Sequence, residues 1–190
     1  MRFSMRYVRD YFWHSKFRSV VFWILEIILV LSIAFAFSWF FCRTITIQDV
    51  SMEPTIANGE KCMIDRLAYS FHAPQRGDLV AFRTSEEEDD ITLVKRVIGL
   101  PGEKILISQG QVLINGETYK ELKGFPPIEN PGLAEEEITL GGTEYFVLGD
   151  NRNDSEDSRY ADIGNIEKKN IIGKLWFRIQ PFSAFGFIGS

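Results

Sequence analysis

The sequence predicts a mainly β protein, in which a single N-terminal transmembrane helix precedes an extracytoplasmic domain of antiparallel β-sheets with a small β/loop insertion. An uninterrupted apolar run at 20–41 predicts the helix. Basic residues gather before that run and are sparse in the stretch that directly follows it, which predicts its direction. The remainder is a series of short segments rich in β-branched and aromatic residues and bounded by Gly, Pro, Asn or Asp, a pattern typical of β domains.

The apolar run, "VVFWILEIILVLSIAFAFSWFF", contains Glu26 as its only ionisable side chain. As a helix it is about 33 Å long at ~1.5 Å per residue, enough to cross a hydrocarbon core of about 30 Å. "AFA" at 34–36 resembles the cleavage site of a signal peptide, but the run is too long for one and bulky "FSWFF" follows. We therefore expect an uncleaved anchor rather than a removed leader or a globular-core helix, with Glu26 near the inner interface or against another helix.

The charges on either side of the run predict its orientation. After it, Arg43 is the one basic residue between 42 and 59. By the positive-inside rule, 1–19 is then a cytoplasmic basic segment and 42–190 is an extracytoplasmic domain. The basic residues before the run are Arg2, Arg6, Arg9, Lys16 and Arg18.

Beyond the anchor, helical periodicity gives way to short apolar segments that predict strands. "ISQGQVLING" predicts a hairpin, with tight turns at Gln-Gly and at Asn115-Gly116. The region 104–143 is expected to form a smaller inserted cap, of which 117–142 is rich in Pro, Gly and Glu. The five acids in 85–90 are expected in a solvated loop. The expected strands lie at 43–48, 60–69, 78–83, 92–100, 103–116, 144–149 and 173–179.

Composition argues against several classes of function. The net charge of -5 and the absence of a basic stripe in the domain disfavour a nucleic-acid partner. The two cysteines, Cys42 and Cys62, are expected to be unpaired thiols. His14 and His72 lie far apart in the chain, so no zinc site is indicated. We expect neither a metal nor a cofactor.

"VSMEPTIANGE" at 50–60 places a serine, Ser51, soon after the anchor. A serine nucleophile needs a base to take its proton, and His72 is the sole histidine of the domain. A lysine is the alternative base, if burial among apolar groups lowers its pKa. Lys95 in "TLVKRVIGLPG" fits, because strand alternation places it on one face with Leu93 and Val97. Without other evidence, such a lysine would more often face solvent.

A polar segment, "LGDNRNDSEDSRYADIG" at 148–164, follows a hydrophobic strand. It departs from the calcium-loop pattern. Its composition fits either a solvated loop or a network in which acids and arginines neutralise one another while a hydroxyl orients the base.

Four stretches in this order behind one anchor resemble type I signal peptidase, the membrane-bound Ser/Lys leader peptidase family. They are "SMEPTI" at 51–56, "RGDLVAFR" at 76–83, "LVKRVIGLPGE" at 93–103 and "GDNRNDSEDSR" at 149–159. The resemblance implies a pair of antiparallel β-sheets with a smaller cap. It also implies a serine endopeptidase that removes signal peptides after small residues of the Ala-X-Ala type, by way of an acyl-enzyme.

The resemblance implies that Ser51 is the nucleophile and Lys95 the general base. The backbone N–H of Ser51 would be one oxyanion donor. The implied partners are signal peptides of secreted preproteins, the lipid bilayer and the secretion translocon. Ser155 would hydrogen-bond the lysine amine, and the other implied supporting residues are Met52, Pro54, Asp150, Arg152, Asp157 and Arg159.

Two positions depart from the family pattern. Asp49 stands where some members have a serine that donates to the oxyanion and many have glycine. A carboxylate there would repel the oxyanion, so we expect Asp49 to point away or the site to rely on other donors. The other departure, at 153 and 154, exchanges Asn and Asp in the turn. Asp49 is also the one support for an alternative function, a catalytically silent membrane protein that binds leaders or secretion partners.

A Ser/Lys self-cleaving regulator is a further alternative function, because it has a related domain. Such proteins need a DNA-binding module, however, and lack this anchor.

The apolar segment "FSAFGFI" at 182–188 predicts a buried last strand, with insertion into the lipid surface as the alternative.

Overall fold

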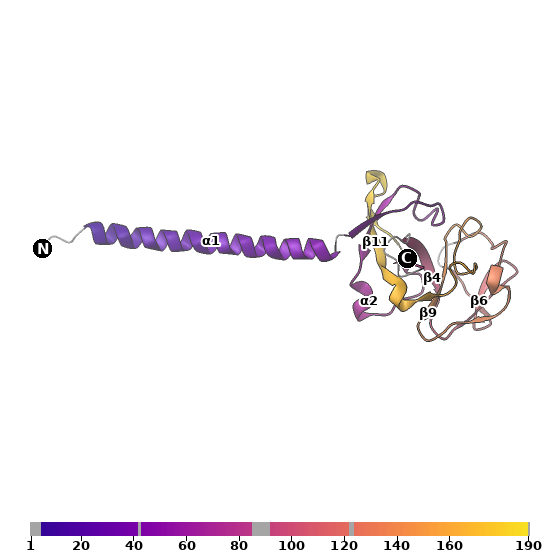
Figure 1. The fold of residues 1–190 in the computed structure, drawn as a ribbon. Helices are drawn as coiled ribbons and strands as arrows, with labels where there is room; N and C mark the ends of the chain where they lie inside the picture. The colour runs from indigo at the N-terminus through magenta and orange to yellow at the C-terminus, as the bar shows by residue number, and fades with distance from the viewer. Residues whose placement is uncertain (1–4, 42, 85–91, 122–123, 190) are drawn as a thin grey trace. The chain divides into compact units, whose positions relative to one another are not determined.

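The structure is a computed structural model that describes residues 5–41, 43–84, 92–121 and 124–189. The chain divides into two compact units, Met1–Phe40 and Phe41–Ser190, each of which is described by itself (Figure 1). Cys42 and the entire acidic run at 85–90, predicted to be a solvated loop, lie outside the described residues.

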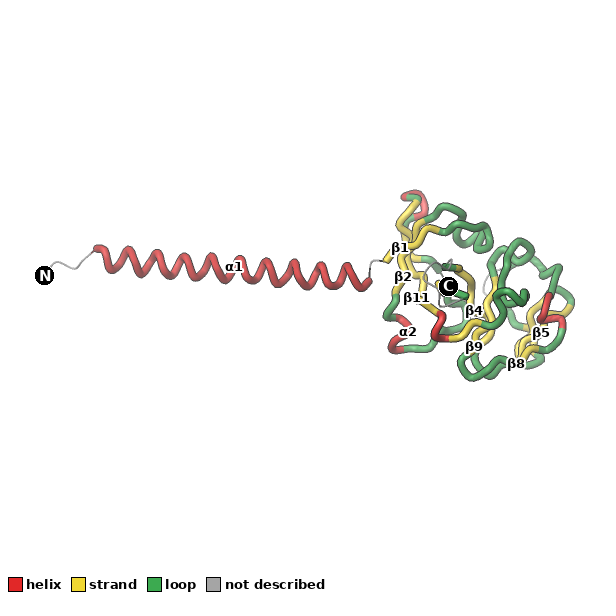
Figure 2. Tube along the Cα trace, in the orientation of Figure 1, coloured by secondary structure: helices red, strands yellow, loops and turns green. Residues whose placement is uncertain are grey.

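The first unit is one long helix, α1 (Met5–Phe41), shown in red in Figure 2. It contains a 20-residue window, Arg18–Phe37, with a mean hydropathy of 2.7 and no buried residues. By length and composition this window can cross a membrane. The helix begins well before the predicted anchor, so the described part of the basic segment is helical too.

The second unit is mainly β, and all of its described strand pairings are antiparallel. The larger sheet has eight strands in the order β1-β2-β11-β3-β4-β9-β10, with β12 paired to β11. Its strands are β1 (Arg43–Thr46), β2 (Lys61–Asp65), β3 (Leu79–Phe82), β4 (Leu93–Gly99), β9 (Glu144–Leu148), β10 (Ile166–Glu167), β11 (Ile171–Gln180) and β12 (Gly186–Phe187).

The smaller sheet has the order β7-β6-β5-β8. Its predicted hairpin is confirmed: Gln109 and Gly110 both have positive φ, 52° and 75°, and so do Asn115 and Gly116 at the next turn. Two successive positive φ values match the twist of antiparallel strands, which is why these residue types occur there. The strands are β5 (Lys104–Ser108), β6 (Gln111–Ile114), β7 (Glu117–Thr118) and β8 (Ile138–Thr139).

Three apolar clusters form the core of the second unit. One lies under the Ser51 turn and includes Met52, Ile56 and Val94. A second joins β4 and β9 to the smaller sheet through residues such as Phe146 and Ile105. The third, which includes Val80 and Val97, occupies the face of β4 that carries Lys95. Strand β4 therefore contributes to all three clusters and is buried along most of its length.

The predicted strand at 60–69 is too long. Strand β2 ends at Asp65, whose Oδ1 accepts hydrogen bonds from the backbone N–H groups of Leu67 and Ala68 at 2.9 and 3.1 Å. This side-chain acceptor turns the chain out of the sheet, and the short helix α2 (Ala68–Phe71) follows. The remaining helices are the 3-10 turns η1 (Gly132–Glu135), η2 (Lys168–Asn170) and η3 (Phe182–Ala184).

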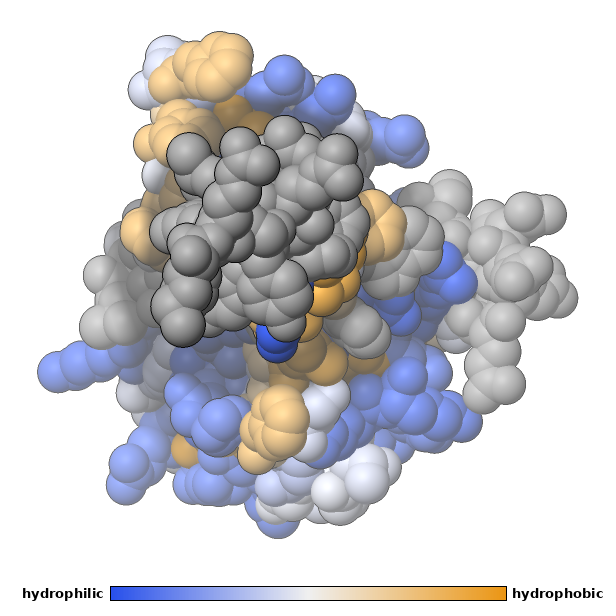
Figure 3. All heavy atoms as spheres, turned by 90° about the vertical axis from the view of Figure 1, so that its left-hand side faces the viewer, coloured by the Kyte–Doolittle hydropathy of each residue, from blue (hydrophilic) through white to orange (hydrophobic). Residues whose placement is uncertain are grey.

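The prediction of a buried last strand at 182–188 is wrong. Only β12 is extended there, and Phe182 and Phe187 are 82% and 79% exposed. Apolar side chains gather at the top of the domain in Figure 3, at the height of the turn after β11 in Figure 1. The aromatic rings contact one another instead of entering a core, and those of Phe177 and Phe185 meet edge to face with their centroids 4.9 Å apart. Hydropathy alone does not separate these two outcomes.

Of the two cysteines, Cys62 is confirmed as a free thiol, buried on β2 opposite Arg178 of the neighbouring strand β11. Burial raises the pKa of this thiol to about 11, so it stays protonated and acts as a small apolar side chain.

Candidate active site

Lys95 lies in the middle of β4 and is 2% exposed. It is paired in register with Val80 of β3, and the predicted face-sharing residues Leu93 and Val97 join Val80 in one apolar cluster. Strand alternation therefore places the lysine among apolar groups, as the sequence pattern predicted.

Ser51 lies on a turn held down by apolar side chains on either side of it in sequence. Met52 and Ile56 are fully buried, and the Ile56 N–H donates to the Met52 carbonyl at 2.9 Å. The turn is also held from outside, since the Asn151 N–H donates to the Ser51 carbonyl at 2.9 Å. Ser51 is itself 4% exposed, so its hydroxyl is fixed within a largely dry site.

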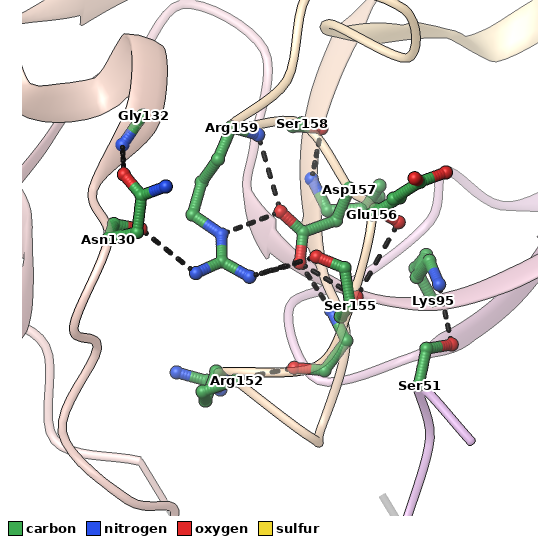
Figure 4. Close-up of polar contacts among 12 residues, drawn as sticks. Ser51, Lys95, Asn130, Gly132, Arg152, Ser155, Glu156, Asp157, Ser158 and Arg159 are labelled. Carbon is green, nitrogen blue, oxygen red and sulfur yellow. Dashed lines mark hydrogen bonds and ion pairs between the residues drawn. The ribbon is translucent and has the colours of Figure 1, made fainter.

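The Lys95 Nζ donates a hydrogen bond to the Ser51 Oγ at 2.5 Å (Figure 4). Residues 44 positions apart in sequence thus meet as a hydroxyl and an amine. This pair can act as nucleophile and base, provided that the amine loses its proton.

Burial lowers the pKa of the Lys95 amine below its ordinary value of 10.5. The negative charges of Asp49, Asp157 and Glu156 oppose this effect, and the positive charge of Arg159 adds to it. Desolvation is the largest of these influences, so a neutral amine becomes accessible at lower pH than for a lysine in water.

Asp49 does not point away from the nucleophile. Its Oδ1 accepts a hydrogen bond from the Ser51 hydroxyl at 2.7 Å and another from the Ser51 backbone N–H at 3.1 Å. Of the two expected arrangements, the one in which Asp49 points away is therefore wrong, and reliance of the site on other oxyanion donors stays a prediction. The reason is local: a side-chain carboxylate two residues before a turn reaches the N–H of that turn readily, as in an Asx turn.

The loop after β9 is a buried network rather than a solvated loop. Asp157 is fully buried, and its Oδ1 accepts from the Arg159 Nε at 2.8 Å. Its Oδ2 accepts from the Arg159 Nη2, the Gly149 N–H and the Ser155 Oγ at 2.9, 3.0 and 3.0 Å (Figure 4). Because every lone pair has a donor, the loop is held in one conformation.

At Gly149 this loop packs directly against the Ser51 turn. A Cβ added there would lie 2.1 Å from the Ser155 Oγ and 2.6 Å from the Ser51 carbonyl oxygen. No other residue type fits so close an approach. The glycine thus allows the network to contact the Ser51 turn.

A family model described as "Signal peptidase, peptidase S26" matches residues 20–180 of this chain. The chain belongs to the signal peptidase family. "Signal peptidase I" of Leptolyngbya laminosa is 34% identical over 149 residues, which cover 75% of this chain and 71% of that protein. "Signal peptidase IB" of Staphylococcus aureus strain COL is 31% identical over 183 residues, which cover 88% of this chain and 93% of that protein.

A crystal structure of a signal peptidase I from Enterococcus faecalis V583 is 30% identical and covers 55% of this chain and 97% of that chain, with a TM-score of 0.42. Family membership makes this chain a peptidase, and the predicted resemblance is confirmed at the level of the family.

Within this signal peptidase, the Ser155 side chain forms a hydrogen bond in the Asp157 network rather than with the Lys95 amine. Its Oγ donates to Asp157, and among the hydrogen bonds of the described residues none joins it to Lys95. Its implied role toward the lysine stays a prediction.

The alternative base, His72, is not brought to the nucleophile. It is exposed, follows α2, and lines a cleft with Asp65, Tyr69 and Asp78 that includes neither Ser51 nor Lys95.

Two buried arginines extend the network. Arg96 donates from Nε and Nη2 to the fully buried carboxylate of Asp150 at 2.7 and 2.6 Å, and from Nη1 to the Gly77 carbonyl at 2.7 Å. The sequence analysis missed Arg96. Its position next to Lys95 on a strand buried on both faces was the available signal, because a buried arginine requires a counter-charge.

Arg152, the second buried arginine, donates to both carboxylate oxygens of Glu121, from Nη1 at 2.6 Å. Its guanidinium also lies 4.5 Å from the centre of the Phe125 ring. Glu121 and Phe125 were missed as well, and no sequence signal connects them to the loop, since they lie in the Pro- and Glu-rich segment before it.

A groove of about 390 Å³ ends beside the nucleophile. It runs along β1, the edge strand of the larger sheet, and its walls include Ile45, Ile47, Val94 and Asp49. This groove is also lined by the polar residues Thr44, Thr46, Gln48 and Thr92. An edge strand beside a groove can pair with an extended peptide. Among the described residues, no group of three or more His, Cys, Asp or Glu is placed to hold a metal ion.

Proposed function

We propose that this chain removes N-terminal signal peptides from secreted preproteins, with Ser51 as nucleophile and Lys95 as general base. The observation that carries the proposal is the 2.5 Å contact between the Lys95 Nζ and the Ser51 Oγ, made by two buried side chains in a member of the signal peptidase family. A serine and a lysine that are both shielded from water form the simplest pair able to transfer an acyl group without a histidine.

The neutral Lys95 amine takes the proton of the Ser51 hydroxyl while the Oγ bonds to the scissile carbonyl carbon. The protonated amine then gives that proton to the leaving nitrogen as the carbon–nitrogen bond breaks. Water then attacks the resulting ester while Lys95 takes a proton from it. The protonated amine gives that proton to the departing Ser51 Oγ, which releases the signal peptide with a free carboxyl group and restores the serine hydroxyl and the neutral amine. The Ser51 N–H would donate to the oxyanion in both steps once it is free of its hydrogen bond to Asp49.

The substrate would lie extended in the groove along β1, whose lining includes Asp49, the hydrogen-bond partner of Ser51. Cleavage after small residues of the Ala-X-Ala type is proposed from the membership of the signal peptidase family. Asp150, Arg152, Asp157 and Arg159 hold the loop that supports the Ser51 turn, and Met52 fixes that turn in the core.

The proposed location follows from α1. Its apolar window would anchor the chain in the cell membrane, with the preceding basic segment in the cytoplasm and 42–190 as the extracytoplasmic catalytic domain. The bilayer and the secretion translocon are the expected partners. Protease treatment of intact cells without their wall tests this orientation: a β domain degraded from outside agrees with it, and a protected domain contradicts it.

The test of the reaction is cleavage of a presecretory protein by the full chain in detergent, with the product mass giving the cut site. Ser51→Ala and Lys95→Ala should each abolish cleavage while thermal unfolding shows a folded domain. Lys104→Ala removes a lysine that is half-exposed and paired with Glu137, and should cut at the wild-type rate. A folded wild type that binds the preprotein without cutting it would favour the silent-binder alternative.

A further inference from the structure

Asp49 occupies the space that the reaction needs. An oxyanion must lie about 2.7–3.1 Å from its donors, and the Ser51 N–H is the donor that the nucleophile itself supplies. The Asp49 Oδ1 lies 3.1 Å from that nitrogen and 2.7 Å from the Ser51 Oγ. It therefore sits where the oxygen of an attacked carbonyl would sit, and the two oxygens cannot share one N–H.

Asp49 also competes with the base. The Ser51 hydroxyl donates its hydrogen to Asp49 and accepts one from Lys95. For the lysine to act as a base, the hydroxyl hydrogen must instead point at the Nζ lone pair. In the observed arrangement, the carboxylate holds the proton that the amine has to remove.

The position of Asp49 explains how it could be released. Its side chain is half-buried and forms the end of the groove along β1, whereas Ser51 and Lys95 lie below the surface. A chain entering the groove meets Asp49 before its carbonyl reaches the serine. A negative charge beside a developing oxyanion is repulsive, so the approach of the scissile carbonyl itself favours departure of the carboxylate.

We propose that Asp49 caps the resting active site, holding the hydroxyl and the N–H of Ser51 until a substrate in the groove displaces it. The cap rests on the proposed Ser51–Lys95 reaction. It adds a positioning residue that limits the rate, protects the nucleophile when no substrate is bound, and makes cleavage depend on occupancy of the groove.

The test compares kcat/KM against pH for the full chain in detergent, acting on one presecretory protein. Asp49→Ala removes the cap, and Asp49→Asn keeps its shape without its charge. Glu156→Gln is the matched control, since Glu156 is a second carboxylate that acts on the Lys95 charge, while its side chain has no described contact with Ser51. Thermal unfolding verifies that each variant is folded.

We expect Asp49→Ala to raise kcat/KM about fivefold on the alkaline plateau, the effect of one hydrogen bond that no longer has to be broken. Asp49→Asn should raise it less. In all three variants the acidic limb should move to lower pH, because the groups charged around Lys95 are Asp49, Asp157, Glu156 and Arg159 and each variant removes one negative charge. Glu156→Gln should leave the plateau unchanged.

A plateau in Asp49→Ala equal to or below that of the wild type would overturn the cap, and a folded but inactive Asp49→Ala would make Asp49 part of the machinery instead. Lys95→Ala in the otherwise wild-type chain separates this failure from failure of the proposed function. If this single variant is folded and inactive, the Ser51–Lys95 pair stands and only the cap is at issue. If it still cuts, the assignment of the base is wrong.

Discussion

The two faces of strand β4 bury adjacent cations and treat them in opposite ways. Lys95 and Arg96 are 2% and 4% exposed. On one face Arg96 has a carboxylate, Asp150, held by two hydrogen bonds, and a carbonyl on its third nitrogen. On the other face Lys95 has apolar neighbours and a hydroxyl. Arginine cannot lose its charge in a protein, so its burial requires a counter-ion, whereas a lysine can be buried by becoming neutral.

The difference shows how one strand supplies both the rigidity and the reactivity of the site. The Arg96 face ties β4 to the loop that follows β9, because Asp150 belongs to that loop. The Lys95 face is left without a full ion pair, which lowers the pKa of the amine. If Lys95 had a carboxylate partner as Arg96 does, its amine would keep its proton and could not act as a base.

The strongest way to break the comparison is Lys95→Arg, which puts the non-titrating cation on the reactive face. Loss of a general base costs about 10²–10⁴ in rate, so we expect cleavage of a presecretory protein to fall by at least about 100-fold. Lys95→Arg also places a permanent cation at a buried position without a counter-ion, so thermal unfolding must show that the variant is folded before its rate is compared. Cleavage by Lys95→Arg within about tenfold of the wild type would show that the lysine acts by charge alone.

On the other face, Asp150→Asn leaves Arg96 buried without its counter-charge. Breaking a buried ion pair from one side destabilises a protein by about 3–5 kcal/mol, and thermal unfolding in detergent should show a loss of this order. The matched double variant, Arg96→Met with Asp150→Leu, should recover much of the stability. If the double variant is no more stable than Asp150→Asn, the loop depends on the carboxylate for more than neutralising Arg96.

The pH dependence of stability provides a third test. The folded-state pKa of Lys95 is lowered from 10.5 by burial, so at neutral pH the unfolded chain binds a proton more readily at this position than the folded chain. Stability from this group therefore rises as the pH increases through the window between the lowered value and 10.5. Lys95→Met should be more stable than the wild type near pH 7, and the gap should narrow towards pH 10. A gap independent of pH would mean that Lys95 is charged in the folded protein.

The smallest expected effect concerns the rim of the network. Glu121→Gln weakens the partner of Arg152, but the Glu121 side chain is 16% exposed where that of Asp150 is 0% exposed. Arg152 also keeps the Gly149 carbonyl and the Phe125 ring. Unfolding should show a loss of about 1 kcal/mol, clearly below that of Asp150→Asn. If Glu121→Gln and Asp150→Asn lost the same amount of stability, the burial of the carboxylate would not determine how much each ion pair contributes.

Local sequence patterns determined a large part of the fold. The apolar run that predicts the span lies in α1, the hairpin turns at 109–110 and 115–116 have the predicted positive φ, and most of the predicted longer strands are present. These features depend on residues close in the chain, where hydrophobic period and turn chemistry are decisive. Strand β2 is shorter than predicted, and of the last strand predicted at 182–188 only β12 forms. Strands β7, β8 and β10 were not predicted as separate strands, because two-residue pairings carry no periodicity.

For the candidate site, the sequence alone identified the residue types, their order and the family they resemble. It placed Lys95 on an apolar face, because strand alternation is a local property. For the loop that contains Asp157 and Arg159, composition left a solvated loop and a network as alternatives, and the resemblance implied that both residues support the site. The sequence did not determine that Asp49 would accept hydrogen bonds from Ser51, or that the last aromatic residues would stay exposed. Nor did it determine the two buried ion pairs, Arg96 with Asp150 and Arg152 with Glu121. Those outcomes depend on which distant groups share a small volume, and only the tertiary structure decides where each buried charge finds its partner.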